Sequence, residues 1–187
     1  MKKPAVFLDR DGVITVERGY AISSIDELEI YSYAEECVEK IKALGYLTII
    51  VTNQSAVAKG LYTEEKLKKM NQAVLKQTGV DALYYCPHHP QGIVPGYAKV
   101  CSCRKPGTGM IDKACSEYDI DLNRSFMVGD RACDILLGQN AGLKTVLLNS
   151  GYGVDGLEEE CNPDIIMGDL RDFAGYLENV IKDMKLI

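Results

Sequence analysis

Short apolar runs alternate along the chain with longer stretches in which apolar residues recur every three or four positions. Each short run predicts a buried β-strand, because strands covered on both faces read as continuous apolar segments. The expected strands lie at residues 5–8, 46–51, 83–85, 125–128, 145–148 and 164–167. The chain therefore predicts a sheet of six strands.

The stretches between these runs have the spacing of amphipathic helices. Val38, Ile41 and Leu44 form one apolar stripe, which Gly45 is expected to end as a C-cap. Thr63 is a suitable N-cap for the next helix. Further helices are expected at residues 110–118, at 132–139 and from 170 to the C-terminal end.

Strands that alternate with helices favour an α/β fold with a mostly parallel sheet covered on both faces. With 187 residues and no repeat or linker, residues 1–187 are expected to form a single domain. Two segments, 12–33 and 86–106, break the alternation. Long loops in compact domains are usually functional or held in place, so both segments are candidates for a site.

The composition is that of a globular protein, with 47% hydrophobic and 26% charged residues. The net charge of −6 opposes nonspecific binding to nucleic acid or to an anionic membrane. No apolar run approaches the length of a membrane span, and the chain enters its first strand without a separate apolar leader. We therefore expect a cytoplasmic protein, in which the seven cysteines need an explanation other than disulfides.

Polar side chains follow several of the expected strands at the point where each one ends. They are Asp9 and Asp11, Thr52 and Asn53, Lys105, and Asp130. The carboxyl ends of parallel strands meet at one edge of a sheet, so these groups should converge. Carboxylates beside a lysine and small hydrogen-bond donors suit Mg²⁺ together with a phosphate group.

The order of these motifs resembles the haloacid dehalogenase-like phosphatase superfamily. The matching residues are Asp9-Arg10-Asp11-Gly12, a strand-end Thr52, Lys105-Pro106, and Gly129-Asp130 with Asp134 four positions later. The resemblance implies a doubly wound, Rossmann-like parallel sheet and a phosphoaspartyl intermediate. No segment is long enough for the cap domain that is common in this superfamily, so a capless form with a metal-binding loop insertion is expected.

The resemblance also implies roles for the acidic residues. Asp9 would attack phosphorus, while Asp11 would protonate the leaving oxygen and then deprotonate the attacking water. Asp9, Asp130 and the backbone carbonyl of Asp11 would hold Mg²⁺. Two roles remain open for Asp134, which either binds Mg²⁺ through water or caps the helix that follows Asp130.

The same resemblance assigns the phosphoryl oxygens to Thr52 and Asn53, with Lys105 balancing their charge. A substrate that carries a second phosphate needs a further cationic anchor away from the reacting centre. The candidates for that phosphate or for the sugar are Arg18, Tyr20, Arg104 and Arg131. For Arg18, an ordinary surface arginine is an equally good interpretation.

Cysteine and histidine residues cluster in the segment at 86–103. Cys86 and His88 lie two positions apart, as do Cys101 and Cys103. Four such ligands bind Zn²⁺ tetrahedrally and leave no position for water, so a structural zinc site is expected, with His89 as an alternative to His88.

This loop, with Arg18-Gly19-Tyr20, resembles the heptose-bisphosphate phosphatases, a family that hydrolyses the 7-phosphate of D-glycero-D-manno-heptose 1,7-bisphosphate. Histidinol-phosphate phosphatases share the loop in a shorter form, and the 12 residues between His88 and Cys101 favour the heptose family. A small sugar phosphate, Mg²⁺ and Zn²⁺ are therefore the expected partners of a monomer. A phosphotransferase remains an alternative, as does a zinc module for nucleic acid or protein, although the latter leaves Asp9 and Asp130 unexplained.

Overall fold

A computed structural model describes residues 2–22, 24–157 and 161–184 of the chain. Its centre is a six-stranded sheet with the order β3-β2-β1-β4-β5-β6, in which every neighbouring pair of strands is parallel. The strands are β1 (Ala5–Leu8), β2 (Leu47–Asn53), β3 (Ala82–Cys86), β4 (Phe126–Gly129), β5 (Lys144–Leu148) and β6 (Ile165–Met167). All six predicted strands are present, and the predicted α/β class is confirmed.

The first four helices connect successive strands from β1 to β5, and the fifth helix follows β6. They are α1 (Ala34–Ala43), α2 (Glu64–Thr78), α3 (Gly109–Glu117), α4 (Ala132–Asn140) and α5 (Leu170–Met184). Thr63 caps α2 as predicted, because its hydroxyl accepts a hydrogen bond from the backbone N–H of Lys66. β2 runs two residues past the predicted end, so Thr52 and Asn53 are its last residues rather than the residues after it.

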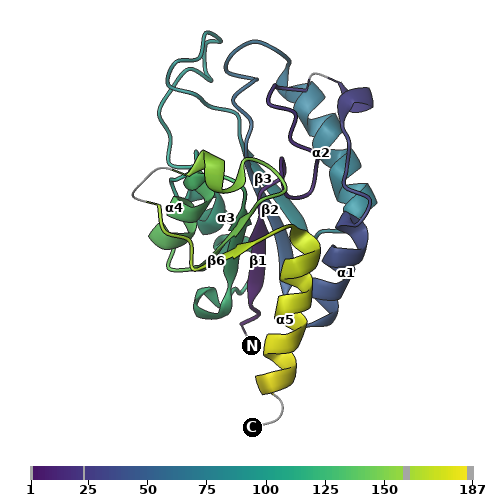
Figure 1. Ribbon diagram of the computed structural model, residues 1–187. Coiled ribbons are helices and arrows are strands. Elements are labelled where there is room, and N and C mark those ends of the chain that lie inside the picture. The colour runs from purple at the N-terminus through teal and green to yellow at the C-terminus, as the bar shows by residue number, and fades with distance from the viewer. Residues whose placement is uncertain (1, 23, 158–160, 185–187) are drawn as a thin grey trace.

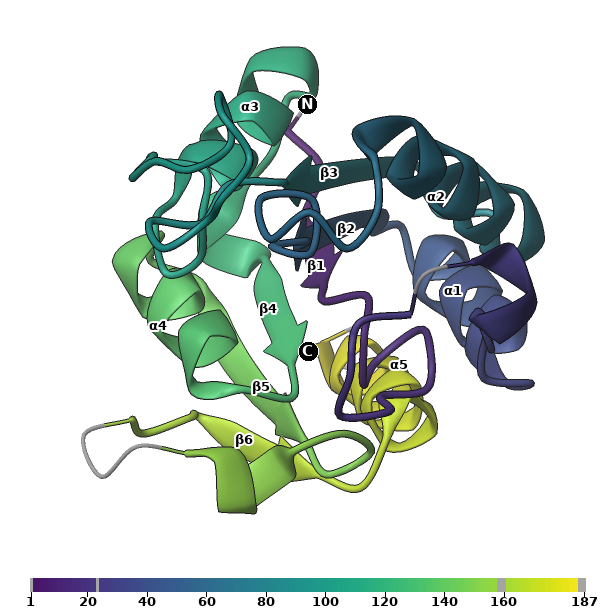
Figure 2. The same ribbon diagram turned by 90° about the horizontal axis from the view of Figure 1, so that it is seen from above.

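The sheet is covered on both faces because alternate side chains of its strands point to opposite sides. Val6 and Leu8 of β1 pack in one buried cluster with residues of α1 and α5. Ala5 and Phe7 pack in another with residues of α3 and α4. Figure 2 shows α3 and α4 on one side of the sheet, with α1, α2 and α5 on the other. This two-layer cover is the predicted doubly wound arrangement.

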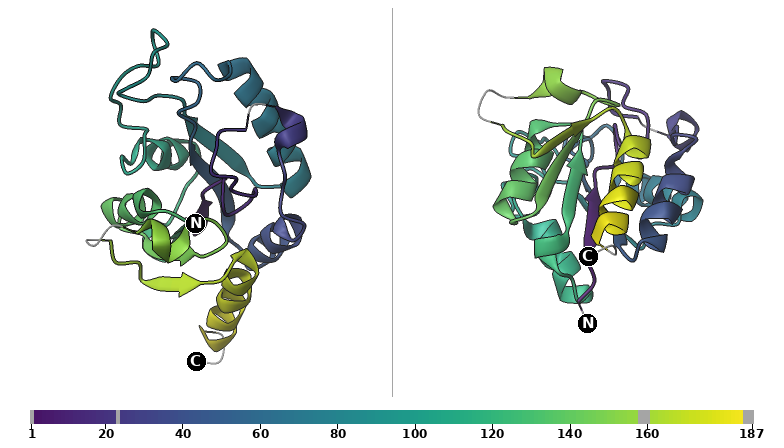
Figure 3. Two further views of the ribbon diagram at one scale, coloured as in Figure 1. Left: turned by 45° about the horizontal axis from the view of Figure 1, so that its top comes forward. Right: turned by 60° about the horizontal axis from the view of Figure 1, so that its bottom comes forward.

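The strand order reverses its direction between β1 and β4. From β1 the chain adds β2 and β3 on one side, and then β4, β5 and β6 on the other. Ligands of such folds bind at the carboxyl ends of the strands next to this reversal. The long segments after β1 and β3 both lie at that end of the sheet (Figures 1 and 3).

These two segments contain little regular structure in their described parts. The first includes a 3₁₀ turn at Ile25–Glu27, and no helix or strand lies between Cys86 and Gly109. No helix in the described residues combines the length and the apolar character needed to cross a membrane.

Candidate functional site

Three carboxyl groups meet at the carboxyl end of β1 and β4. Asp9 directly follows β1, Asp130 directly follows β4, and Asp134 lies in the first turn of α4. Oxygen atoms of the three lie within 4.8 Å of one another, and all three residues are buried. Asp9 and Asp130, which are far apart in the sequence, are therefore close enough to bind one cation.

Lys105 places a buried positive charge beside these carboxylates. Its Nζ lies 2.8 Å from Oδ1 of Asp9 and 2.6 Å from Oδ1 of Asp134, and it donates a hydrogen bond to the carbonyl of Val51. Although burial lowers the pKa of Lys105, the charges of Asp134 and Asp9 raise it well above its usual value. Lys105 is thus held as a cation at this position.

One lysine does not balance three buried carboxylates, and the pKa values of Asp130 and Asp9 reflect the excess negative charge. Burial, and then the charges of Asp9 and Asp134, raise the pKa of Asp130 to about 8. Burial also raises the pKa of Asp9 to about 6, although Lys105 opposes the rise. A divalent cation in this cluster would compensate the negative charge that contributes to these raised pKa values.

Asp130 has one oxygen atom left for such a cation. Its Oδ2 accepts a hydrogen bond from the backbone N–H of Tyr152 at 2.9 Å. Its Oδ1 is buried and has no hydrogen-bond partner in the described part of the chain. A Cβ atom added to Gly12 or Gly151 would come within 2.3 Å or 2.0 Å of Asp130 Oδ2, so both glycines make room for this side chain.

Asp11 is held differently, by four hydrogen bonds from side chains. Arg10 donates to both of its oxygens at 3.0 Å, Thr15 donates at 2.9 Å and Gln54 at 2.8 Å. Burial raises the pKa of Asp11, but the charge of Arg10 and the hydrogen bonds from Gln54 and Thr15 outweigh it, so that the pKa lies below its usual value. The carboxylate form of Asp11 is therefore favoured.

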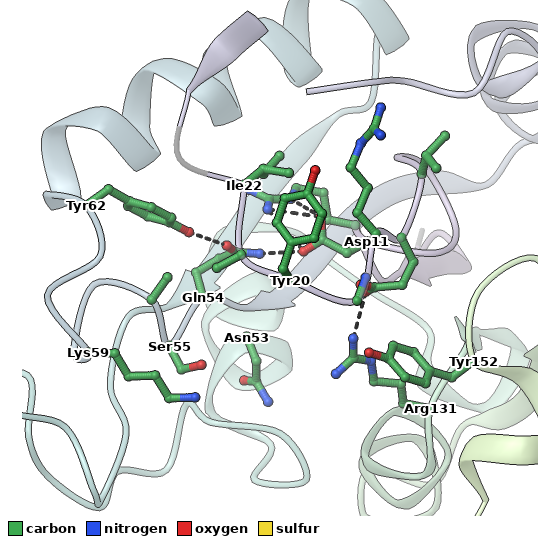
Figure 4. Close-up of a pocket in the computed structure, with 17 residues that line it drawn as sticks. Asp11, Tyr20, Ile22, Asn53, Gln54, Ser55, Lys59, Tyr62, Arg131 and Tyr152 are labelled. Atoms are coloured by element: carbon green, nitrogen blue, oxygen red, sulfur yellow. Dashed lines mark hydrogen bonds and ion pairs between the residues drawn. The ribbon is translucent and has the colours of Figure 1, made fainter. Parts of the chain in front are cut away.

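Two side chains that support Asp11 were not assigned a role from the sequence. Arg10 is only 1% exposed, and its Nη1 also donates to Asn71 of α2. Gln54 bonds to Asp11 and to Thr52 through Nε2, and its Oε1 accepts from the hydroxyl of Tyr62 (Figure 4). The contacts of Arg10 with Asn71 and of Gln54 with Asp11 join segments 61 and 43 positions apart, so local patterns contained no sign of them.

The predicted phosphate ligands line a cavity of about 130 Å³ above the carboxylates. Thr52, Asn53 and Lys105 border it together with Asp9 and Asp11. The side-chain amide of Asn53 is already engaged at both ends, because Oδ1 accepts from the backbone N–H of Lys105 and Nδ2 donates to its carbonyl. Asn53 therefore fixes the backbone of Lys105 in addition to facing the cavity.

A second cavity of about 250 Å³ adjoins the first, because Asp11, Asn53, Ser55 and Arg131 line both. Figure 4 shows its lining, in which Tyr20 and Ile22 face Asn53 and Ser55. A ligand with its phosphate in the smaller cavity would extend into this larger one.

The rim residues predicted to hold a second phosphate are placed in different ways. Arg18 and Tyr20 line the larger cavity, but Arg18 pairs with Glu29 at 2.6 Å. Arg131 pairs with Glu17 at 2.7 Å, and its guanidinium lies 4.1 Å from the ring centre of Tyr152.

Arg104 borders the smaller cavity only, and it donates a hydrogen bond to the carbonyl of His88. The structure thus divides the four candidates between the two cavities, with Arg131 bordering both.

The Cys and His residues of the loop at 86–103 form a second cluster. The three sulfur atoms of Cys86, Cys101 and Cys103 lie 3.2–3.4 Å apart, and Nδ1 of His88 lies 3.4–3.7 Å from two of them. These separations are close to the value of about 3.8 Å between thiolates of a tetrahedral zinc site. The cysteines are free thiols, and His89 does not belong to the cluster, since its Nδ1 accepts from the backbone N–H of Gln91.

Comparisons with known proteins agree with this arrangement. A family model described as HAD-hydrolase-like matches residues 102–173. D-glycero-beta-D-manno-heptose-1,7-bisphosphate 7-phosphatase of Pasteurella multocida is 42% identical over 155 residues, which cover 80% of this chain and 83% of that protein. The protein of the same name from Haemophilus ducreyi is 36% identical over 95% of this chain and 100% of its own length.

A solved structure of a similar protein has the same fold. The D,D-heptose 1,7-bisphosphate phosphatase of B. bronchiseptica, crystallised with magnesium and phosphate, superposes with a TM-score of 0.80 at 29% identity. The match covers 94% of this chain and 98% of that one.

Proposed function

Since the chain belongs to the haloacid dehalogenase-like hydrolases, in the group of the heptose-bisphosphate 7-phosphatases, we propose that it removes the 7-phosphate of D-glycero-D-manno-heptose 1,7-bisphosphate. The observation that carries this proposal is the meeting of Asp9, Asp130 and Lys105 below a cavity lined by Asp11 and Thr52. A nucleophile, a cation site and a phosphate pocket are the parts that phosphoryl transfer requires.

We assign the attack on phosphorus to Oδ2 of Asp9. Oδ1 is occupied, because it accepts hydrogen bonds from the backbone N–H of Arg10 at 2.7 Å and lies 2.8 Å from Lys105 Nζ. A bond forms between Oδ2 and phosphorus while the bond from phosphorus to the sugar oxygen breaks. The two contacts to Oδ1 orient the carboxylate during this step.

Asp11 handles the protons of both steps. The negative charge of a bound phosphate opposes the lowering of the Asp11 pKa by Arg10 and favours the protonated form, which gives its proton to the departing sugar oxygen. The resulting carboxylate then accepts a proton from the water that attacks the phosphoaspartyl group. That attack breaks the bond between Asp9 and phosphorus and releases inorganic phosphate. Arg10, Thr15 and Gln54 hold the carboxylate that receives the proton from water.

Mg²⁺ is the proposed catalytic cofactor, and the residues fit it. The acidic cluster offers Oδ1 of Asp130, which is buried and without a hydrogen-bond partner in the described residues, and an oxygen of Asp9. Mg²⁺ prefers one or two carboxylates, with water and substrate oxygens in its other positions. When bound, it would neutralise the charge of the phosphoryl group. The backbone carbonyl of Asp11 stays a predicted third ligand.

For Asp134 we propose a positioning role. Its Oδ1 lies against Lys105, and its Oδ2 accepts from the backbone N–H of Arg131 at the start of α4. Both oxygens are therefore engaged by groups other than a metal, which favours the helix-capping alternative. Asp134 then keeps Lys105 in place, where its positive charge balances the charge of the phosphoryl oxygens bound by Thr52 and Asn53.

The second proposed metal is a structural Zn²⁺ in the Cys/His cluster. Cys86, His88, Cys101 and Cys103 supply four ligands of the soft and borderline types that zinc selects. With four protein ligands, the site has no open position for water or substrate. We infer that this metal holds the loop and takes no part in the chemistry.

The substrate assignment is tested by comparing kcat/KM for heptose 1,7-bisphosphate, fructose 1,6-bisphosphate and histidinol phosphate, with phosphate release as the readout. We expect a clear preference for the heptose bisphosphate, because the larger cavity is lined by several cationic side chains. A preference for histidinol phosphate would overturn the proposal in favour of the alternative suggested by the loop.

We further propose a cytoplasmic location and a monomer. No disulfide joins the cysteines of the described residues, which suits a reducing compartment. Size-exclusion chromatography with light scattering would test the oligomeric state.

A further inference from the structure

The larger cavity contains several cations, and most of them are already paired. Arg10 is bound to Asp11 and Asn71. Arg18 pairs with Glu29, and Arg131 pairs with Glu17. An anion that entered the cavity would have to compete with these carboxylates for each arginine.

Lys59 lines the same cavity and differs from these arginines. It is exposed, and its side chain has no hydrogen bond or ion pair within the described residues. Figure 4 shows it extending toward Ser55 and Asn53, across the cavity from Arg131 and Tyr152. Its ammonium group is therefore available to an anionic group of a ligand.

The backbone around Lys59 is well fixed although the side chain is not. The N–H of Lys59 donates to the carbonyl of Ser55 at 3.0 Å, and the residues from Ala56 to Ala58 are buried. Gly60 has φ of +72°, which glycine adopts without strain. Lys59 is thus presented from a rigid loop.

The loop that holds the Cys/His cluster contributes directly to this rigidity. The backbone N–H groups of Ile93 and Val94 both donate to the carbonyl of Ala58, at 2.8 Å and 3.0 Å. A Cβ atom added to Gly92 would lie 2.8 Å from Cβ of Ala58 and 2.9 Å from its carbonyl oxygen. The metal-binding loop therefore packs closely against the residue that precedes Lys59.

We propose that Lys59 binds the phosphate that is not cleaved, and that the Cys/His loop positions Lys59 through Ala58. This inference rests on the proposed function, because it requires a substrate with a phosphate at each end. The phosphate that reacts occupies the smaller cavity, and the other one lies in the larger cavity against the unpaired ammonium group. Lys59 then determines the preference for a bisphosphate over a monophosphate.

The test compares heptose 1,7-bisphosphate with heptose 7-phosphate, which lacks the distal group. For Lys59→Gln we expect KM for the bisphosphate to rise roughly tenfold or more, since hydrogen bonds between charged groups are the stronger ones. The values of kcat and the constants for the monophosphate should not change. Lys59→Arg should restore most of the binding, and Lys66→Gln serves as a control for the loss of one exposed charge.

The positioning role is tested with Gly92→Ala, whose added methyl group would displace Ala58. We expect the same selective rise in KM with zinc content unchanged. Normal kinetics in this variant would overturn the role of the loop.

The binding role fails if Lys59→Gln keeps the full preference for the bisphosphate, or if it weakens both substrates equally. It also fails if the wild-type enzyme cleaves the bisphosphate without preferring it to the monophosphate. Failure of the wild-type enzyme to cleave heptose bisphosphate would instead overturn the proposed function.

Discussion

Replacement of Asp130 by asparagine should stabilise the metal-free protein, although it removes a residue of the proposed active site. Asp130 is buried beside Asp9 and Asp134, and its pKa is raised from 3.8 to about 8. A carboxyl group with a raised pKa in the folded state stabilises that state only at low pH. This stability is lost as the pH rises from the unfolded pKa through the folded one.

The two pKa values set the size of the effect. The unfolded state releases the proton of Asp130 near pH 3.8, whereas the folded state still holds it near pH 7. The difference is about three pH units. At 1.36 kcal/mol for each unit, the penalty is about 4 kcal/mol as an upper bound. Asp9 shares this proton, and asparagine keeps the hydrogen bond from Tyr152, so we expect Asp130→Asn to gain on the order of 2 kcal/mol.

Urea unfolding in the presence of EDTA, at several pH values between about 5 and 8, measures this difference. The free energy of unfolding of the wild-type protein should fall as the pH rises, and that of Asp130→Asn should fall less. Added Mg²⁺ should stabilise the wild-type protein increasingly at higher pH, because it replaces protons on the carboxylates. The variant should lose most of this stabilisation.

Asp134→Asn is the matched control, because it removes a charge from the same cluster. This variant loses the ion pair with Lys105, so we expect it to be destabilised instead. The reasoning is refuted if Asp130→Asn is less stable than the wild-type protein without metal, or if it retains the full stabilisation by Mg²⁺.

Three further predictions concern the other parts of the two sites. Asp9→Asn should reduce phosphate release below detection while circular dichroism stays unchanged, and retained turnover would contradict the assigned nucleophile. Lys105→Met should lower the free energy of unfolding by about 3–5 kcal/mol, because it leaves buried carboxylates unpaired, whereas the exposed Lys113→Met should have little effect in the same urea titration. Freshly purified protein should contain zinc by metal analysis, and wild-type protein without zinc would contradict the assignment. Cys103→Ser should lose the zinc and show faster hydrogen exchange in the loop. Cys115→Ser should keep the zinc.

The strands and the meeting of the acidic residues could be predicted because each depends on local sequence. A run such as Ala5–Leu8 is buried on both faces, and a polar residue at its end must lie at the sheet edge. The convergence of Asp9 and Asp130 then follows from a parallel sheet in which β1 and β4 are neighbours. The end of β2 was predicted less well, because Thr52 and Asn53 pair with β3 although they are polar.

The support around Asp11 could not be predicted in full, because Gln54 lies 43 positions from Asp11 and Arg10 is held by a residue in α2. Arg10 looks like an exposed residue in a charged turn, yet it is buried by its pairing with Asp11 and with Asn71, which lies 61 positions away. It could not be predicted either that Lys59 has no ion pair within the described residues, because the fold determines which acidic residues pair with the arginines around it. Only the folded chain determines these pairings.

The consecutive residues Cys103, Arg104 and Lys105 link the two sites, which raises the question of whether loss of zinc would disturb the catalytic centre. Lys105 has its own anchors, because both ends of the Asn53 side chain bond to its backbone and its ammonium group contacts Asp9 and Asp134. These contacts come from the sheet and from α4, and none of them depends on the Cys/His cluster. Chelation of zinc should therefore loosen the loop and weaken substrate binding, while the response of the protein to Mg²⁺ remains.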